Sequence, residues 1–167
     1  MAAGSTYTPI ATQTLGSAAA SVTFSSISGA YTDLVLVCNT GVTAAGGYTL
    51  YMRLNGDTTT LYSGTRLSGN GSAAASYRAS SLSFIFAGLN LPNTLTNNVI
   101  FQLMNYSNST TNKTVLYRMN DASGGVAAGV GLYRSTSAIT SIELSAELGA
   151  TTLLAGSTFT LYGIAAA

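Results

Sequence analysis

Apolar and polar residues alternate in short segments along most of the chain, the pattern of β-strands with one buried face. The clearest segments are residues 140–148 and 157–164, and in the second Phe159 and Leu161 face the same side. β-branched and aromatic residues, which favour strands, fill nearly every position there. The pattern predicts that the two segments pair as a hairpin around residues 149–156.

Nine further segments have strand character and are separated by turns rich in Gly, Ser and Asn. They are residues 7–15, 21–24, 31–39, 48–54, 61–67, 81–86, 98–105, 114–119 and 130–134. No window has the apolar spacing at i, i+3, i+4 and i+7 of an amphipathic helix. The chain is therefore predicted to be all-β: a single antiparallel β-sandwich, jelly-roll-like, with about 8–11 short strands.

Four segments carry more specific expectations. Residues 31–39 have apolar side chains on both faces, which predicts a central strand covered on both sides. The dipeptide Asn55-Gly56 tolerates the positive φ of a type I′ turn. Residues 57–77 are polar and punctuated by Gly, so we expect a long loop on a rigid scaffold, with one weak strand near 61–67. Residues 124–131 are rich in Gly and Ala and indicate a flexible loop.

The length of 167 residues fits one domain. Residues 21–167 are predicted to form the sandwich, and residues 1–20 an N-terminal arm or edge strand, because Pro9 cannot donate to a sheet. No apolar run is long enough to span a bilayer, and no secretory signal is seen at the N-terminus. The single Cys38 lies mid-strand and is expected to be a buried, inert thiol of a chain made in the reducing cytoplasm.

Composition changes this picture mainly through charge. Only 7% of the residues are charged, against about 25% in an average protein, and the net charge is +1. There is no basic patch for nucleic acid or an anionic membrane, so neither is an expected partner. A neutral surface also gives little colloidal repulsion, which hints at a protein that lives in a permanent assembly.

Candidate catalytic chemistry is sparse. The absence of His excludes Ser–His and Cys–His dyads, and one Cys excludes a thiolate zinc site. Glu143 and Glu147 share a strand face but lie about 13 Å apart, beyond the separation of about 5–9.5 Å in glycosidase pairs. A pair with Asp33, Asp57 or Asp121 stays open. A solvated strand face or a subunit contact explains the two glutamates more simply, and we expect no enzyme activity.

Three weaker signals are best explained without a ligand. Asp57 supplies one carboxylate, too few for a calcium site. The Gly-rich residues 124–131 have no Lys-Ser/Thr and no βαβ setting for phosphate. In a chain this rich in Asn, Ser and Thr, chance accounts for the Asn-x-Ser/Thr sequons, which start at Asn70, Asn105, Asn108 and Asn112. We therefore expect no cofactor and no metal.

Tyrosines and arginines are the candidate contact residues. The chain has ten Tyr and no Trp. Exposed Tyr can bind sugars or anchor an interface, whereas half-buried Tyr packs between strands. The tyrosines concerned are Tyr51, Tyr62, Tyr77, Tyr117, Tyr133 and Tyr162. Singly placed arginines could bind carboxylates of a partner; they are Arg53, Arg66, Arg78, Arg118 and Arg134. A subunit interface is predicted to include Tyr7, Pro9, Ile10, Arg66, Tyr77, Arg78 and Arg134.

Five stretches of the chain resemble a group of small β-rich virion proteins of tailed bacteriophages, including phages of cyanobacteria and marine bacteria. They begin at Tyr7-Thr-Pro-Ile, Tyr31-Thr-Asp-Leu, Met52-Arg-Leu-Asn-Gly-Asp, Gly69-Asn-Gly-Ser and Gly156-Ser-Thr-Phe-Thr-Leu-Tyr. The shared features are strands and turns, not a catalytic motif. The resemblance offers no site residues.

The resemblance implies a structural protein of the virion, made in the host bacterial cytoplasm. The first hypothesis is a capsid cement or decoration protein that binds across subunits of the major capsid protein and forms a dimer or trimer with copies of itself. The alternative is a tail-fibre or receptor-binding module that recognises a host surface glycan through residues 57–77 and exposed tyrosines. A polysaccharide-degrading enzyme is disfavoured by the carboxylate spacing.

Overall fold

The computed structural model describes residues 6–120, 125–147 and 149–165. Twelve strands and no helix are found in these ranges, and none of the described residues belongs to a helix able to cross a membrane. The strands are β1 (Tyr7–Thr14), β2 (Ser21–Phe24), β3 (Asp33–Thr40), β4 (Tyr48–Leu54), β5 (Tyr62–Gly69), β6 (Ala74–Leu82), β7 (Ile85–Leu91), β8 (Asn97–Met104), β9 (Lys113–Asn120), β10 (Val126–Tyr133), β11 (Ile142–Ala146) and β12 (Thr158–Ile164).

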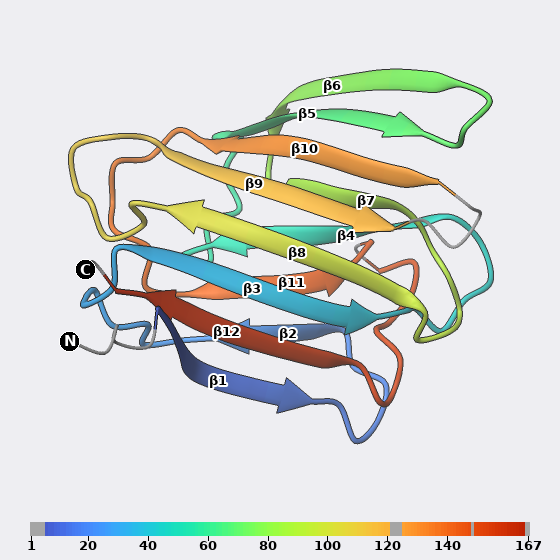
Figure 1. The fold of residues 1–167 in the computed structure, drawn as a ribbon, viewed down its shortest axis with the longest axis horizontal. Coiled ribbons are helices and arrows are strands. Elements are labelled where there is room, and N and C mark those ends of the chain that lie inside the picture. The colour runs from blue at the N-terminus through green and yellow to red at the C-terminus, as the bar shows by residue number, and fades with distance from the viewer. Residues whose placement is uncertain (1–5, 121–124, 148, 166–167) are drawn as a thin grey trace.

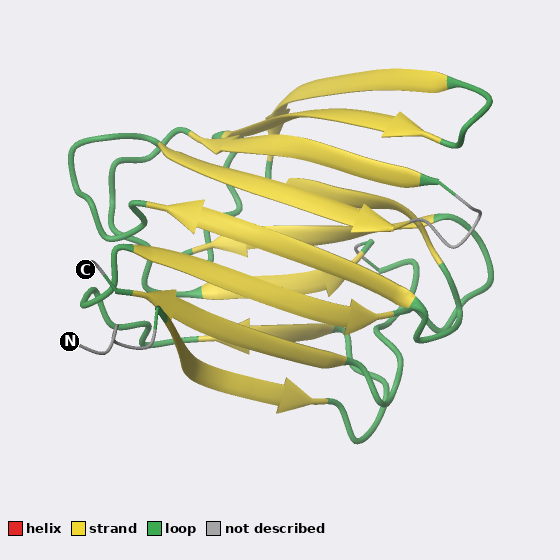
Figure 2. Ribbon diagram, in the orientation of Figure 1, coloured by secondary structure: helices red, strands yellow, loops and turns green. Residues whose placement is uncertain are grey.

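The strands form two antiparallel sheets that pack face to face as a β-sandwich. The larger sheet has eight strands in the order β1-β12-β3-β8-β9-β10-β5-β6, and the smaller sheet has the order β2-β11-β4-β7. Figure 1 shows the larger sheet in front of the smaller one, and Figure 2 shows no helix among the described segments that connect the strands. The prediction of an all-β antiparallel sandwich is confirmed.

The connectivity is that of a jelly roll with two inserted hairpins. If β5–β6 and β9–β10 are set aside, β1-β12-β3-β8 faces β2-β11-β4-β7. Numbered from 1 to 8 along the chain, these strands have the orders 1-8-3-6 and 2-7-4-5, the arrangement of a jelly roll. Both hairpins extend the larger sheet beyond β8 (Figure 1). They account for a strand number above the expected 8–11.

Alternation along the central strands fills the core. Leu34 and Leu36 of β3 are fully buried and, with Cys38, point toward the smaller sheet. Cys38 is buried, as predicted, and burial raises the pKa of its thiol. Val35 is buried but Val37 is partly exposed, and no layer of the described chain covers that face. The expectation that β3 is covered on both faces is therefore wrong.

The predicted hairpin of the last two segments is also wrong. The strand β11 pairs with β2 and β4 in the smaller sheet, whereas β12 pairs with β1 and β3 in the larger one. The chain between them crosses from one layer to the other. Alternation specifies which face of a strand is buried, but in a jelly roll neighbours in sequence need not be neighbours in a sheet.

The expected long loop at residues 57–77 is a hairpin for most of its length. The strands β5 and β6 pair from Tyr62↔Leu82 to Gly69↔Ala74. Asn70 closes their turn, because its Oδ1 accepts hydrogen bonds from the N–H groups of Ser72 and Ala73 at 3.0 and 2.8 Å. β5 corresponds to the weak strand predicted near 61–67. β6 was not predicted, because it is mostly exposed and needs little apolar character.

Two neighbouring boundaries also differ from expectation. The segment 81–86 is not one strand: β6 ends at Leu82, the chain bends, and β7 begins at Ile85 in the other sheet. The Asn55-Gly56 turn has the predicted positive φ values, 55° and 65°. It joins β4 to a segment that leads into the other sheet, however, so its flanking strands do not form a hairpin.

The Gly-rich segment 124–131 is mostly strand, not flexible loop. Residues 121–124 lie outside the described residues, but β10 begins at Val126 and pairs along its whole length with β5 and β9. Its glycines allow close approach of neighbouring side chains. The missing side chain of Gly129, for example, leaves room for the Tyr117 hydroxyl, which would lie 2.3 Å from an added Cβ.

At the N-terminus, residues 7–14 form an edge strand rather than a free arm. The strand β1 pairs antiparallel with β12 from Tyr7↔Ile164 to Thr14↔Thr158, with a bulge between Pro9 and Ala11. Pro9 thus lies in an outermost strand, where a missing N–H is tolerated.

Two buried tyrosines give a matched stability test. The Tyr62 hydroxyl accepts from the Leu54 N–H at 3.1 Å and lies 3.1 Å from the Leu54 carbonyl. The Tyr117 hydroxyl is buried without a hydrogen-bond partner among the described residues. We expect Tyr62→Phe to lower the free energy of unfolding by about 1–3 kcal/mol and Tyr117→Phe to leave it unchanged or raise it. Urea denaturation of both variants measures this difference, and equal losses would contradict it.

Candidate functional site

The most distinctive surface is the face of the larger sheet that points away from the smaller one, here called the outer face. Of eight large apolar side chains that are exposed among the described residues, five lie on this face. They are Leu67, Met104, Leu116, Val126 and Val130. Strand alternation sends them outward, and no second layer of the described chain covers them (Figure 1).

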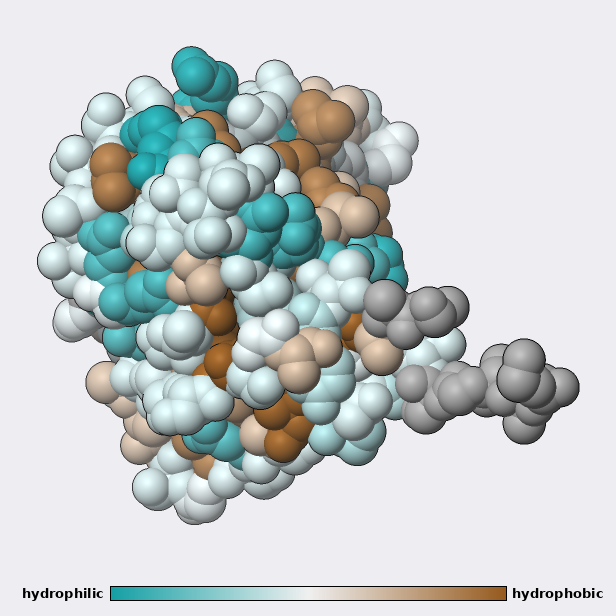
Figure 3. All heavy atoms as spheres, turned by 90° about the vertical axis from the view of Figure 1, so that its left-hand side faces the viewer, coloured by the Kyte–Doolittle hydropathy of each residue, from teal (hydrophilic) through white to brown (hydrophobic). Residues whose placement is uncertain are grey.

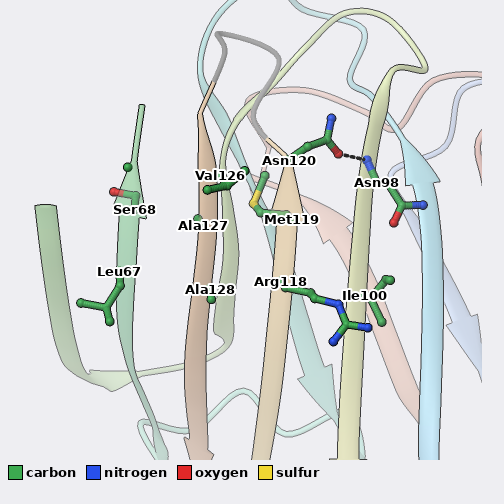
Figure 4. Close-up of a pocket in the computed structure, with 11 residues that line it drawn as sticks. Leu67, Ser68, Asn98, Ile100, Arg118, Met119, Asn120, Val126, Ala127 and Ala128 are labelled. Atoms are coloured by element: carbon green, nitrogen blue, oxygen red, sulfur yellow. Dashed lines mark hydrogen bonds between the residues drawn. The ribbon is translucent and has the colours of Figure 1, made fainter. Parts of the chain in front are cut away.

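Two adjoining hollows indent this face where β8, β9, β10 and β5 run side by side. One has a volume of about 600 Å³ and the other about 400 Å³, and Leu67, Arg118 and Ala128 line both. We call the two together the outer groove. Figure 4 shows Leu67 on β5 and Val126 on β10 at one side, with Ile100 on β8 at the other. Leu67 and Val126 are 63% and 64% exposed, high values for such side chains.

The groove carries little polarity. Arg118 is the only charged residue among the described residues that line it. At one end, Oδ1 of Asn120 accepts a hydrogen bond from the Asn98 N–H at 2.6 Å (Figure 4). The amide nitrogen of Asn120 donates to the Thr96 carbonyl at 3.0 Å. These groups are satisfied within the chain. The groove is thus suited to an apolar partner surface, with Arg118 available to fix orientation.

The predicted interface residues do not form one patch. Tyr7, Pro9 and Ile10 lie on β1, at one edge of the larger sheet. Tyr7 is exposed and packs edge-on against Tyr162 at 6.1 Å between ring centroids. Ile10 is half-buried against the core. The remaining candidates lie at or near the opposite edge of that sheet.

The four candidates at or near that opposite edge have different surroundings. Arg78 of β6 is exposed. Arg66 of β5 lies against Tyr77 of β6, with 5.3 Å between the guanidinium carbon and the ring centroid. Arg134 follows β10 and donates to Ser63 Oγ at 3.2 Å and to the Thr60 carbonyl at 3.0 Å. Arg134 therefore anchors the start of β5 within the chain.

The tyrosines divide into core and surface. Tyr62, Tyr117 and Tyr133 are buried, and Tyr62 stacks on Tyr133 at 4.6 Å between centroids. Burial raises the pKa of Tyr117 to about 12. Packing between strands is therefore the role of these three. Tyr77, in contrast, is 51% exposed and stays a candidate for binding.

Three of the five carboxylates are engaged in structural contacts. Glu143 faces Arg53 across β11 and β4, with 3.7 Å between Oε1 and Nη1. Asp57 Oδ1 accepts from the Thr59 hydroxyl, which together with the Thr59 N–H and the Tyr133 hydroxyl holds the pKa of Asp57 below its usual value. Asp33 Oδ1 accepts from a backbone N–H at 2.6 Å. These contacts within the chain give the three carboxylates a structural role.

Two further expectations concern metals and the remaining acidic residues. Glu147 lies just beyond the end of β11, so the two glutamates are not on one strand as assumed. Asp121 lies outside the described residues. Within the described ranges, no group of three or more potential metal-ligating side chains is found.

Sequence reasoning missed the outer groove. The signal was present in part, because Val126, Ala128 and Val130 alternate along what proved to be β10. Gly129, Gly131 and the glycines before Val126 made that segment look like a loop. Leu67 and Leu116 join them only through the strand order β9-β10-β5, which alternation does not specify.

No protein-family model matches this chain, and no curated protein matches it in sequence.

Proposed function

We propose that this protein is a structural, non-enzymatic component of a tailed-phage virion: a capsid cement protein that docks through its outer groove onto subunits of the major capsid protein. The observation that carries the proposal is the exposed apolar groove on the eight-stranded sheet. Burial of apolar surface is the dominant favourable term in most protein–protein association. A protein that bridges capsid subunits needs such complementary surface and no chemistry.

The character of the remaining surface supports a role in an assembly. Figure 3 shows one end of the sandwich covered mainly by residues of intermediate hydropathy, with scattered groups of strongly hydrophilic and strongly hydrophobic residues. The single lysine of the chain, Lys113, is buried and donates from Nζ to the Thr136 carbonyl at 3.0 Å. The outermost strands of the larger sheet, β1 and β6, therefore have no Lys, and Arg78 is their one charged residue, so little discourages strand pairing. We expect partner subunits, including copies of this chain, to cover them.

The alternative function is a receptor-binding module of the tail. One observation favours it: a hollow lined by aromatic side chains beside Arg66, on the other face of the β5–β6 hairpin. The residues 57–61 that precede this hairpin, and its turn at Asn70, do not line the hollow. A glycan site on a long loop at residues 57–77 is therefore no longer expected. Under the alternative function, the site lies on the strands and aromatic residues around this hollow.

Binding to capsids from which loosely attached proteins have been stripped tests the cement proposal. We expect the purified protein to bind stripped heads, and Leu67→Asp to weaken binding by about 30-fold or more, the effect of losing one interface hot spot. Ser21→Asp, which adds the same charge at an exposed position of the smaller sheet, is the control and should bind normally.

A monomeric protein that fails to bind stripped heads would end the cement proposal. The copy number in the virion separates the two functions further. Hundreds of copies per particle support head decoration, whereas a few to a few dozen support a place in the tail.

A further inference from the structure

The hollow beside Arg66 lies where the β5–β6 hairpin meets β4 and β7, on the outward side of the smaller sheet. Its volume is about 270 Å³, and the rings of Tyr51, Tyr77, Phe84 and Phe86 line it together with Arg66. We call it the aromatic pocket. Four rings from three different segments thus converge on one small cavity, in a chain that has only ten Tyr and five Phe.

The rings of the aromatic pocket hold one another in place. Tyr51 stacks on Phe84 with 3.8 Å between centroids and 14° between planes. Tyr77 meets the buried Phe86 edge-on at 5.4 Å. The guanidinium carbon of Arg66 lies 5.3 and 5.8 Å from the ring centroids of Tyr77 and Phe86, within the range of cation–π attraction. The ring of Tyr77 is nevertheless half-exposed, so a ligand can reach it.

We infer that the aromatic pocket binds an uncharged pyranose ring of a glycan, with Tyr77 as its stacking platform. The C–H groups on one side of a pyranose are weakly positive and pack against the negative face of an aromatic ring. The hydroxyls of Tyr51 and Tyr77 can donate to and accept from sugar hydroxyls, and a guanidinium donates only. Such an alternation of ring faces and polar groups complements a sugar, which is apolar on its faces and polar at its rim.

The volume of the aromatic pocket and the charges near it limit the class of ligand that it can bind. A volume of about 270 Å³ lies just below the 300–1,000 Å³ of pockets for drug-sized molecules, so it suits a single ring. Arg66 supplies a positive charge. Glu147 contributes, after burial, to the raised pKa of Tyr51, so a negative charge lies near this ring as well. Charges of both signs near one small pocket favour a neutral sugar over an acidic or a basic one.

The pocket is independent of the cement proposal, because Tyr77 and Leu67 belong to opposite faces of the same hairpin. A variant at one position leaves the other surface unchanged. Loss of head binding by Leu67→Asp and loss of glycan binding by Tyr77→Ala are therefore separate results, and either proposal can fail alone.

NMR titration of the isotope-labelled full chain tests the inference. The probes are methyl glycosides of glucose, galactose, mannose and N-acetylglucosamine, with the methyl glycoside of glucuronic acid as the charged comparison. We expect at least one neutral glycoside to shift the signals of Tyr77 and its neighbours, with a dissociation constant in the millimolar range typical of a ligand this small. Tyr77→Ala should weaken binding at least tenfold, and Tyr77→Phe should retain most of it.

Tyr7→Ala is the matched control, since Tyr7 is 52% exposed, about as much as Tyr77, and lies on the opposite edge of the larger sheet. It should not change the titration. The inference is overturned if no neutral glycoside produces shifts, if the two alanine variants weaken binding equally, or if the glucuronoside alone binds.

Discussion

Replacing Phe159 with alanine should lower the free energy of unfolding by about 3–5 kcal/mol. The ring is fully buried in β12, between β1 and β3 of the larger sheet, and points into the core. Removing it forfeits the transfer free energy of the ring and leaves a cavity that surrounding strands cannot fill. A single domain has a stability of about 5–15 kcal/mol, so this one change removes a large share of it. Urea or thermal denaturation measures the loss.

Thr158→Ala is the matched control for that measurement. Thr158 is the preceding residue on β12, points to the opposite face and is partly exposed. It should change stability by no more than about 0.5 kcal/mol, as surface substitutions usually do. Melting of the Phe159→Ala variant at the temperature of the unchanged protein would show that the ring faces solvent rather than the core.

The position of β12 also explains why its loss should unfold the whole domain. It lies between β1 and β3, so it joins the first strand of the chain to the middle of the larger sheet. Alternation alone was sufficient to predict this strand and its buried face. It was not sufficient to predict its partners, because Tyr7 and Ile164 pair across nearly the entire chain. β11 was the expected partner of β12 because the two are neighbours in sequence. The jelly-roll crossover places them in different sheets.

Strands were predictable from the sequence where one face is buried by the second layer. β8 and β9, whose burial alternates at every residue, were located nearly to their ends. β6 was missed because almost every residue in it is exposed, so no apolar periodicity is required. Such a strand is held by its backbone hydrogen bonds to β5, and side-chain patterns carry little information about these.

The candidate surfaces were predictable only in part, because side-chain patterns do not specify the order of strands in a sheet. Tyr77 and Arg66 were recognised as contact residues by their chemistry, and the structure brings them together. Tyr7 and Pro9 were grouped with them, but the sheet order places β1 and β6 at opposite edges. The composition of a surface can be read from a sequence, whereas the partners of each residue depend on long-range strand order.

Gly131→Ala should destabilise the protein by about 1–3 kcal/mol, although alanine is usually the better residue in a strand. Gly131 lies in β10 where β7 of the other sheet approaches. An added Cβ would lie 2.4 Å from one methyl carbon of Ile85, and two further atoms of that side chain would be within 2.9 Å. Ile85 is fully buried, so it cannot move aside without displacing the core. Urea denaturation should show a lower midpoint with an unchanged slope.

A double-mutant cycle shows whether this contact is the cause. Ile85→Ala alone should cost about 2–5 kcal/mol through the cavity it leaves. In the double variant the methyl group introduced by Gly131→Ala enters that cavity, so the combined loss should be smaller than the sum of the two single losses by at least about 0.5 kcal/mol. Simple additivity would contradict the packing argument. In that case, the close approach of the smaller sheet would not explain the glycines of β10.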